Sequence, residues 1–159
     1  MVGKDMPSGD GWAAGPNGIR VWGRYGAAGL FLLAGDRLLL QHRAEWTNQG
    51  NTWGIPGGAR EFHETPADAA LRETQEECGI APHEVEVLAA EVTAGPYPGD
   101  GWTYTTVVAR TCSGDILPTQ ANEESKELRW VPLDEMESLD LLPPFRGALP
   151  HIARLCQRL

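Results

Sequence analysis

Three glutamates, Glu73, Glu76 and Glu77, have the chemistry and the spacing needed to hold a metal ion. On an α-helix, residues spaced i, i+3 and i+4 fall within an arc of roughly 100°, so we expect the three carboxylates to converge on one point. Ionised carboxylates that lie so close repel one another unless a cation lies among them, and a hard divalent ion suits that position. The alternative is a solvent-exposed acidic face, and three glutamates without further evidence would point to that alternative.

The residues around these glutamates predict the helix that must carry them. Thr65 is a good N-cap, and Pro66 suits the first helical position because an N–H there has no helical partner. Asp68 lies near the positive end of the helix dipole. Gly79 can adopt the left-handed conformation that ends a helix. We therefore expect a helix over residues 66–78.

The segment from residue 58 to residue 80 fits the pattern G-x(5)-E-x(7)-R-E-U-x-E-E-x-G-U, in which U is apolar. The fixed positions are Gly58, Glu64, Arg72, Glu73, Glu76, Glu77 and Gly79, and Ile80 is the final apolar residue. This pattern resembles the signature of the Nudix hydrolases, and chance would produce it on the order of once in 100,000 such sequences. One departure is Thr74, where an aliphatic residue is usual. Threonine is small and β-branched, so we expect only a packing adjustment.

The resemblance implies a role for each residue of the pattern. Glu76 and Glu77 are implied metal ligands, and Glu73 either joins them or orients the attacking water. Arg72 lies one turn before Glu76 and can hold that carboxylate or brace Glu73. Consecutive glycines let the backbone come close to the ion, and the carbonyl of Gly57 is an implied ligand. The expected cofactor is Mg2+ or Mn2+.

Other candidate residues leave alternatives open. Glu64 is either a distant metal ligand or part of the scaffold where the helix starts. Family members often add a carboxylate from a later loop, and Glu124 is preferred to Glu123 for that position, with a solvated surface glutamate as the alternative. His63 could serve as a general base, although a glutamate-rich metal site does not need one. Cys78 is expected to point away from the glutamates and to pack.

Substrate identity rests on weaker cues. The segments 38–43 and 53–58 look like those of MutT-type members, which act on nucleoside triphosphates. The asparagine with which oxidised-guanine-specific relatives read the base follows a Pro-Pro-like turn, and the comparable turn over 142–146 lacks it. Pro96 is a competing cue, because ADP-ribose pyrophosphatases commonly carry a proline at that distance from the pattern. The candidate substrate-binding side chains are Arg43, Tyr97, Trp102 and Tyr104.

Arginine can contact phosphate, and the aromatic rings either stack on a base or pack beside a loop. We therefore expect a metal-dependent pyrophosphohydrolase for a nucleoside diphosphate-linked substrate, most simply a nucleoside triphosphate cleaved to the monophosphate and pyrophosphate. One alternative is hydrolysis of ADP-ribose or another nucleotide sugar. Another is a non-catalytic nucleotide sensor on the same fold, which a damaged pattern would indicate. The pattern is intact, and there is no G-x-S-x-G, no G-x-x-x-x-G-K-[ST] and no G-x-G-x-x-G.

Composition agrees with a compact cytoplasmic enzyme. The chain has 159 residues, of which 42% are hydrophobic, enough for one domain with a substantial core. Its net charge of -9 disfavours nucleic acid as a partner and makes a cation more necessary for a phosphorylated substrate. The 3 cysteines lack a C-x-x-C and are expected to be reduced. The longest apolar run, over 27–34, is too short to span a membrane. A homodimer is left open.

The pattern along the chain predicts an α+β fold with a mixed β-sheet between helices, as in the Nudix fold. Residues 1–18 are rich in Gly, Pro, Ser and Asp and are expected to form a flexible arm, and 19–159 a single domain. A hairpin is expected around Gly35 and Asp36. Strands are expected over 27–34, 37–43, 53–58, 85–93, 102–111 and 127–131. Further helices are expected over 132–139 and 148–159.

Overall fold

The computed structural model describes residues 8–159, in which a mixed sheet lies between helices. Its seven strands are β3 (Ala27–Ala34), β4 (Arg37–Arg43), β5 (Trp53–Gly54), β6 (Gly57–Ala59), β7 (Val85–Ala94), β8 (Tyr104–Thr111) and β9 (Ser125–Pro132). The helices are α2 (Pro66–Cys78) and α3 (Pro143–Gln157), with the 3-10 helices η1 (Pro16–Gly18), η2 (Pro82–Glu84) and η3 (Leu133–Ser138). A small second sheet consists of β1 (Trp12–Ala14) and β2 (Arg20–Trp22).

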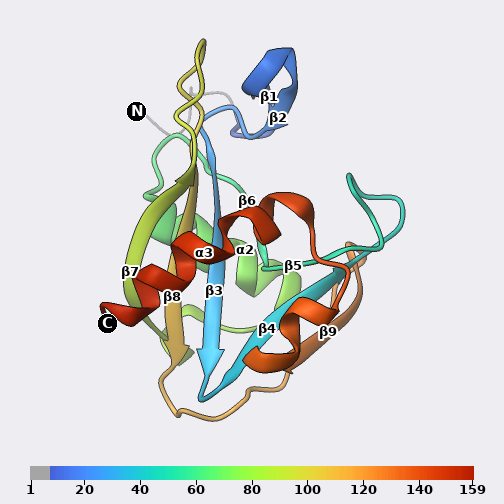
Figure 1. Ribbon diagram of the computed structural model, residues 1–159, viewed down its shortest axis with the longest axis vertical. Helices are drawn as coiled ribbons and strands as arrows, with labels where there is room; N and C mark the ends of the chain where they lie inside the picture. The colour runs from blue at the N-terminus through green and yellow to red at the C-terminus, as the bar shows by residue number, and fades with distance from the viewer. Residues whose placement is uncertain (1–7) are drawn as a thin grey trace.

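The hairpin of β3 and β4 opens into a gap within the sheet. The two strands pair only near their turn, where Leu33 faces Leu38 and Ala34 faces Arg37. They then diverge, as Figure 1 shows. Beyond that point β3 pairs with β6 and β4 pairs with β5, so the segment 53–59 occupies the gap. The sheet is completed by β9 antiparallel to β4, β8 parallel to β3, and β7 antiparallel to β8.

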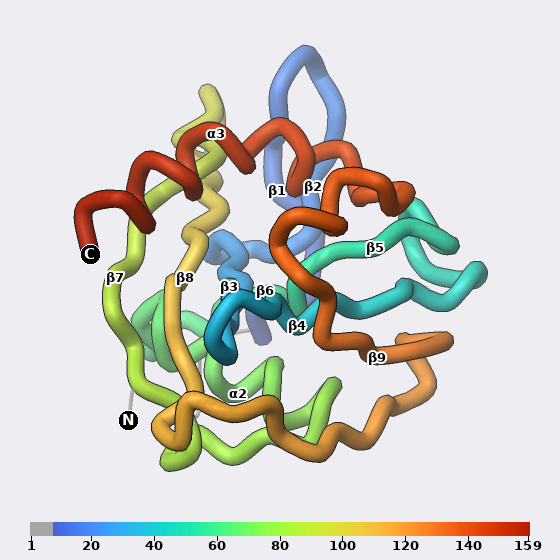
Figure 2. The backbone as a smooth tube through the Cα atoms, turned by 60° about the horizontal axis from the view of Figure 1, so that its bottom comes forward, coloured from blue at the N-terminus to red at the C-terminus, as the bar shows by residue number. Residues whose placement is uncertain are grey.

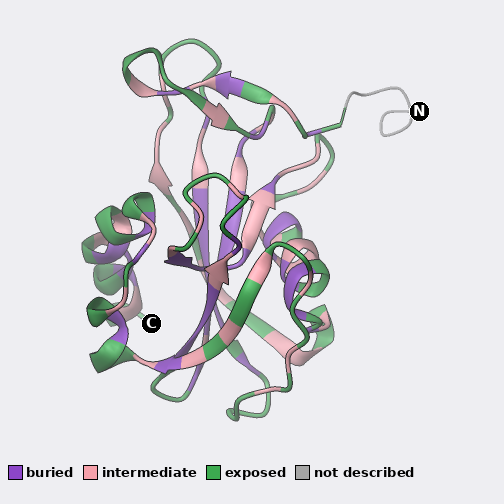
Figure 3. Cartoon of the chain, turned by 90° about the vertical axis from the view of Figure 1, so that its right-hand side faces the viewer, coloured by how far each residue is buried: buried purple, intermediate pink, exposed green. Residues whose placement is uncertain are grey.

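Each face of the sheet has its own hydrophobic core. Because successive strand residues point to opposite faces, Leu30 and Leu32 of β3 pack with the α2 residue Ala69, whereas Phe31 packs with the α3 residue Phe145. The buried residues therefore line the two inner faces in Figure 3, and Figure 2 shows α2 and α3 on opposite sides of the strands. The predicted sheet between helices is confirmed.

Local signals define α2 as the sequence predicts. The hydroxyl of Thr65 accepts a hydrogen bond from the backbone N–H of Asp68 at 3.1 Å, and Gly79 ends the helix with φ at 75°. Thr74, the departure from the pattern, is buried, and its hydroxyl donates to the carbonyl of Ala70 at 2.8 Å. The polar group of Thr74 is therefore satisfied within the helix.

The N-terminal segment differs from the flexible arm expected over 1–18. Residues 12–14 form β1, which pairs with β2, while residues 1–7 lie outside the described part of the chain. Contacts distant in sequence hold this hairpin. The N–H of Ala14 donates to Asp100 at 2.7 Å, and the indole N–H of Trp102 donates to the carbonyl of Trp22 at 3.1 Å. Composition alone carries no sign of such contacts.

The last helix also differs from its expected bounds, because α3 begins at Pro143 rather than at Ala148. Pro143 and Pro144 occupy the first helical positions, where the missing N–H groups have no helical acceptor to lose. A third proline, Pro150, lies inside the helix. Across residues 8–159, no helix combines the length and the apolar character needed to cross a membrane.

Candidate active site

Glu77 is the α2 glutamate that faces the gap in the sheet. Only 3% of the residue is exposed. Its Oε2 accepts a hydrogen bond from the backbone N–H of Gly57 at 3.1 Å, and its Oε1 accepts one from the Nε2 of Gln41 at 3.3 Å. The divergence of β3 and β4 therefore lets a backbone amide and a buried side chain reach the same carboxylate.

Arg72 binds the other carboxylates of the pattern. Its Nε and Nη2 donate to Glu64 at 2.7 and 2.8 Å, and its Nη1 donates to Glu73 at 3.0 Å. The same Nη1 lies 3.5 Å from Glu76, and Nη2 also donates to the carbonyl of Ala59 at 3.1 Å. This geometry favours the scaffold alternative for Glu64, because both of its carboxylate oxygens are occupied by Arg72.

The expected convergence of three carboxylates on one point is not observed. Glu73 and Glu76 turn to Arg72, whereas Glu77 turns to Gly57, because each carboxylate is oriented by its nearest donor. The side chain of Glu76 is 56% exposed. Among residues 8–159, no three Asp, Glu, His or Cys side chains are arranged as a complete metal site.

A loop before β9 brings Glu124 to the site. The N–H of Gln120 donates to the carbonyl of Cys78 at 2.9 Å, and the amide of Asn122 donates to the carbonyl of Glu76 at 3.4 Å, so the loop docks on the last turn of α2. The N–H of Ala44 donates to the carbonyl of Glu124 at 2.9 Å. These contacts place the exposed Glu124 where its charge acts on the α2 carboxylates.

Burial and mutual repulsion make the site electrostatically strained. Burial raises the pKa of Glu77 well above its ordinary value, and the charges of Glu73 and Glu124 raise it further, against the hydrogen bonds from Gln41 and Gly57. Burial also raises the pKa of Glu73, although Arg72 opposes that shift. Both pKa shifts indicate that negative charge is gathered here beyond what the neighbouring donors offset.

Two glycines let the strand β6 approach both β3 and α2. A side chain on Gly57 would collide with the backbone of β3, since its Cβ would lie 2.6 Å from the Cα of Gly29. A Cβ on Gly58 would instead lie 2.7 Å from the carboxylate carbon of Glu73. Gly57 is therefore required by strand pairing, and Gly58 leaves space for a carboxylate of the site.

The chemistry of this donor set fits a hard divalent cation. The candidate donors are carboxylate and carbonyl oxygens, the ligands that Mg2+ and Mn2+ prefer. A cation among them would relieve the repulsion that raises the pKa values of Glu73 and Glu77. Cys78 is not a competing ligand or nucleophile, because it is fully buried and burial raises the pKa of its thiol to about 12. His63 is exposed in the loop before α2.

The aromatic candidates differ in what they contact. Trp102 is 9% exposed and stacks on Tyr97, with ring centroids 5.6 Å apart and an interplanar angle of 5°. This burial favours the packing alternative for Trp102, whose indole N–H also donates to the carbonyl of Trp22. The hydroxyl of Tyr104 lies over Gly29, and burial raises its pKa, as does the charge of Glu77.

Arg43 is oriented by its own loop. Its Nη2 and Nε donate to the carbonyl of Asn48 at 2.9 and 3.3 Å. This contact holds the guanidinium at the end of β4, close enough for its charge to act on the hydroxyl of Tyr104.

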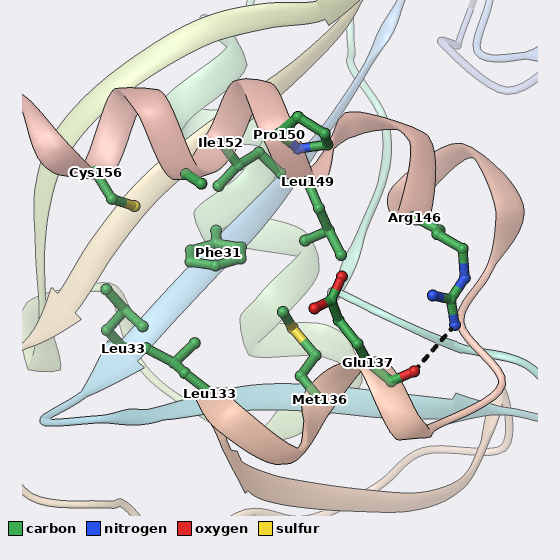
Figure 4. Close-up of a pocket in the computed structure, with 11 residues that line it drawn as sticks. Phe31, Leu33, Leu133, Met136, Glu137, Arg146, Leu149, Pro150, Ile152 and Cys156 are labelled. Atoms are coloured by element: carbon green, nitrogen blue, oxygen red, sulfur yellow. Dashed lines mark hydrogen bonds between the residues drawn. The ribbon is translucent and has the colours of Figure 1, made fainter.

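A cavity of about 500 Å3 lies on the other face of the sheet, between β3, η3 and α3 (Figure 4). Its walls are mainly apolar and include Phe31, Met136 and Leu149. At one end Arg146 donates to the carbonyls of Leu139 at 2.9 Å and Glu137 at 3.5 Å. None of the predicted site residues lines this cavity, which therefore belongs to the α3 core and not to the carboxylate site.

Gln41 and Ser125 are polar residues near the carboxylates that lie outside the sequence pattern. Gln41 is 2% exposed although it lies in the strand β4 among buried leucines, and Ser125 begins β9. The signal in the sequence is a glutamine directly after three strand leucines, because a buried amide needs hydrogen-bond partners.

Comparisons with known proteins agree with the geometry. A model described as the NUDIX domain matches residues 23–153. A Mycobacterium tuberculosis protein named "Putative 8-oxo-dGTP diphosphatase 3" is 51% identical over 147 residues, which cover 88% of this chain and 67% of that protein. A Bifidobacterium longum "nucleoside triphosphate pyrophosphatase/Nudix hydrolase fusion protein" is 39% identical over 155 residues, which cover 91% of this chain but 31% of that protein. The crystal structure of RenU, a Nudix hydrolase from M. smegmatis, superposes with a TM-score of 0.89 at 43% identity, over 95% of this chain and 97% of that one.

Proposed function

Because this chain belongs to the Nudix hydrolase family, whose members act on phosphoanhydride bonds, we propose that it uses a divalent cation to cleave a nucleoside triphosphate into the monophosphate and pyrophosphate. The observation that carries the proposal is the buried Glu77, whose pKa is raised by burial and by the charges of Glu73 and Glu124. Glu73 and Glu77 are shielded carboxylates that repel each other within an intact sequence pattern, which favours a cation site over a solvated face. A sensor that has lost activity would not need to keep it.

In this proposal the ion would be held by oxygen atoms of Glu73, Glu76, Glu77 and Glu124 and by the carbonyl of Gly57. A bound divalent cation supplies neutralisation of charge on the phosphate oxygens and lowers the pKa of a water. Arg72 keeps Glu73 at 3.0 Å, so that this carboxylate is ready to bind the ion or to orient the water. The attack is by water, because the one thiol beside the carboxylates, Cys78, is buried and protonated.

Substrate contacts are proposed for Arg43, Tyr97 and Tyr104. Tyr104 lies near both Glu77 and Arg43, because each of these charges acts on its hydroxyl. Tyr97 is half-buried and shares one ring face with Trp102. The names of the relatives support a nucleoside triphosphate over a nucleotide sugar. The segment 142–146 forms the start of α3 and carries no asparagine, which disfavours a preference for oxidised guanine.

The experiment is a substrate panel with product identification. Nucleoside triphosphates including dGTP and 8-oxo-dGTP, dinucleotides, ADP-ribose and nucleotide sugars are incubated with Mg2+ or Mn2+, and the products are identified by chromatography and 31P NMR in 18O-labelled water. We expect a monophosphate and pyrophosphate, with label from water in one product and no phosphorylated enzyme. Glu77→Gln should lose about 100-fold or more in rate, while Glu135→Gln, at an exposed position of η3, serves as the matched control and should not.

Full activity in the presence of a chelator would defeat the proposal. So would release of inorganic phosphate as the sole small product, or a trapped phosphoenzyme. Two monophosphates from ADP-ribose at a higher kcat/KM than any triphosphate would replace the triphosphate with a sugar-linked substrate and leave the reaction class unchanged.

A further inference from the structure

The amide of Gln41 is the link between the carboxylate of α2 and the strand that follows the Glu124 loop. Its nitrogen Nε2 donates to Oε1 of Glu77 at 3.3 Å and to the hydroxyl of Ser125 at 2.7 Å. An NH2 group has two protons, so these two contacts use both of its donors. The position of the amide is therefore set from two sides, by a helix and by a strand that lie 36 and 84 residues away in the chain.

A break in strand pairing brings Ser125 to this position. The register of β4 and β9 shifts between His42 and Arg43, so that Ser125 faces Arg43 at the start of β9. Bulges of this kind re-aim side chains and occur beside functional sites. The residue before Ser125 is Glu124, whose carbonyl is bound by the N–H of Ala44. The chain at Glu124 is thus held by Ala44 through the Glu124 carbonyl and by Gln41 through the side chain of the next residue, Ser125.

Burial also restricts the rotation of the Gln41 amide. Gln41 is 2% exposed, and no buried side-chain nitrogen or oxygen atom among the described residues lacks a hydrogen-bond partner. A buried donor that leaves its acceptor would go unpaired, so rotation of this amide is unfavourable. The Oε1 of Glu77 is consequently held in one direction, and its other oxygen is held by Gly57.

We propose that Gln41 is a positioning residue that, through Ser125, fixes Glu77 and the Glu124 segment relative to each other and so sets the affinity for the divalent cation. This inference rests on the proposed function, since it concerns the same site. Residues that hydrogen-bond to metal ligands typically change metal affinity by about 10- to 100-fold when they are replaced. Gln41 acts through Glu77 and touches neither cation nor substrate.

The test measures Mn2+ affinity of the full chain by electron paramagnetic resonance, in the absence of any substrate. Gln41→Met keeps the length of the side chain and removes both donors, and Ser125→Ala removes only the acceptor that orients the amide. We expect the dissociation constant for Mn2+ to rise by about 10- to 100-fold in Gln41→Met and by less in Ser125→Ala. The double variant should be no weaker than Gln41→Met, because both changes break one chain of hydrogen bonds.

Thr111→Val is the matched control. Thr111 is also buried in the sheet, and its hydroxyl donates to the carbonyl of Asp115 at 2.9 Å, at the far end of β8. This variant loses a comparable buried hydrogen bond and should bind Mn2+ like the wild type. A second readout is the side-chain amide signal of Gln41 in 15N NMR, which should shift when Mg2+ is added, as a merely structural glutamine would not.

Each outcome decides the inference. Wild-type affinity in a folded Gln41→Met variant overturns it, as do additive losses in the double variant or an equal loss in Thr111→Val. If Gln41→Met does not fold, Ser125→Ala decides, and wild-type affinity there overturns the inference. If the wild type itself does not bind Mn2+, the proposed function fails as well, so the two failures are distinguishable.

Discussion

Glu76 and Glu77 are neighbours in the sequence, but they face opposite environments. Glu77 is buried and its pKa is raised, whereas Glu76 is 56% exposed and lies 3.5 Å from Arg72. Both are proposed ligands, so Glu77→Gln and Glu76→Gln should each lower the rate by about 100-fold or more. In the absence of metal, the two substitutions should differ in their effect on the free energy of unfolding.

For an acid with a raised folded pKa, the charged form is what destabilises the fold, so stability falls as pH rises from the unfolded pKa through the folded one. Replacing Glu77 by glutamine removes that charge, so the metal-free variant should be more resistant to urea at pH 7 than the wild type. Glu76→Gln should unfold within about 0.5 kcal/mol of the wild type, because exposed ion pairs contribute little. Urea titrations in chelator measure both; a strongly destabilised Glu77→Gln would contradict the charge argument.

The two glycines of β6, Gly57 and Gly58, should respond differently to replacement by alanine. Gly57→Ala places a Cβ against the backbone of β3, which cannot move without breaking the strand pairing, so the fold should lose about 1–3 kcal/mol. Gly58→Ala meets the end of the flexible Glu73 side chain, so activity should fall more than stability. Thermal unfolding and initial rates on both variants separate the two effects, and the reverse ranking would contradict the geometry.

At the scale of elements, the start of α2 is fastened by the ion pair of Arg72 and Glu64. The hydrogen bond from Arg72 lowers the pKa of Glu64. The pair therefore contributes stability that is fully present above the unfolded pKa of about 4.5 and is lost as pH falls through the lower, folded pKa. Glu64→Gln should be less stable than the wild type at pH 7, and the difference should vanish in acid.

Urea unfolding of the two proteins at a series of pH values measures this difference. Mn2+ binding at pH 7 provides the control, because a scaffold residue should leave the affinity nearly unchanged. A stability difference that is the same at every pH, or a large loss of Mn2+ affinity with unchanged stability, would instead support Glu64 as a metal ligand.

The bounds of α2 could be predicted because its signals are local. Thr65, Pro66 and Gly79 act within one turn of the helix ends, and the carboxylate spacing lies within a single helix. The β1–β2 hairpin could not, because it is held by contacts with Asp100 and Trp102 that span 86 and 80 residues of the chain. The start of α3 was missed because Pro143 and Pro144 suggest a turn, although both are compatible with a first helical turn.

The site shows the same division between local and distant information. The full sequence pattern proposes Glu73, Glu76 and Glu77 as site residues. The orientations of their carboxylates depend on Gly57 and Arg72, and they differ from the convergence on one point that helix geometry predicts. Gln41 was missed because both of its partners are fixed by the tertiary fold.

For the molecule as a whole, the site should couple to global stability. A ligand that binds only the folded state raises its stability by RT ln(1 + [L]/Kd), about 2.7 kcal/mol at a hundred times Kd. Mn2+ should therefore raise the Tm of the wild type and barely change that of Glu77→Gln. Calorimetry with and without chelator measures the shift, and an equal shift in both proteins would place the bound ion elsewhere.

The gap between β3 and β4 divides the sheet into two ribbons joined by only two residue pairs near the turn, with β5, β4 and β9 on one side and β6, β3, β8 and β7 on the other. Cooperative units of unfolding often coincide with groups of strands of this kind. The hydrogen bond between Glu77 and Gln41 links α2, which packs on β3, to β4 on the other side of the gap. An ion bound at Glu77 would therefore couple the unfolding of the two ribbons. In chelator, native-state hydrogen exchange should give a lower free energy of opening for the amides paired between β4 and β9 than for those between β3 and β8. When Mg2+ is added, the two free energies should become equal. The cation would then have two roles: it would support hydrolysis, and it would make the two ribbons unfold together.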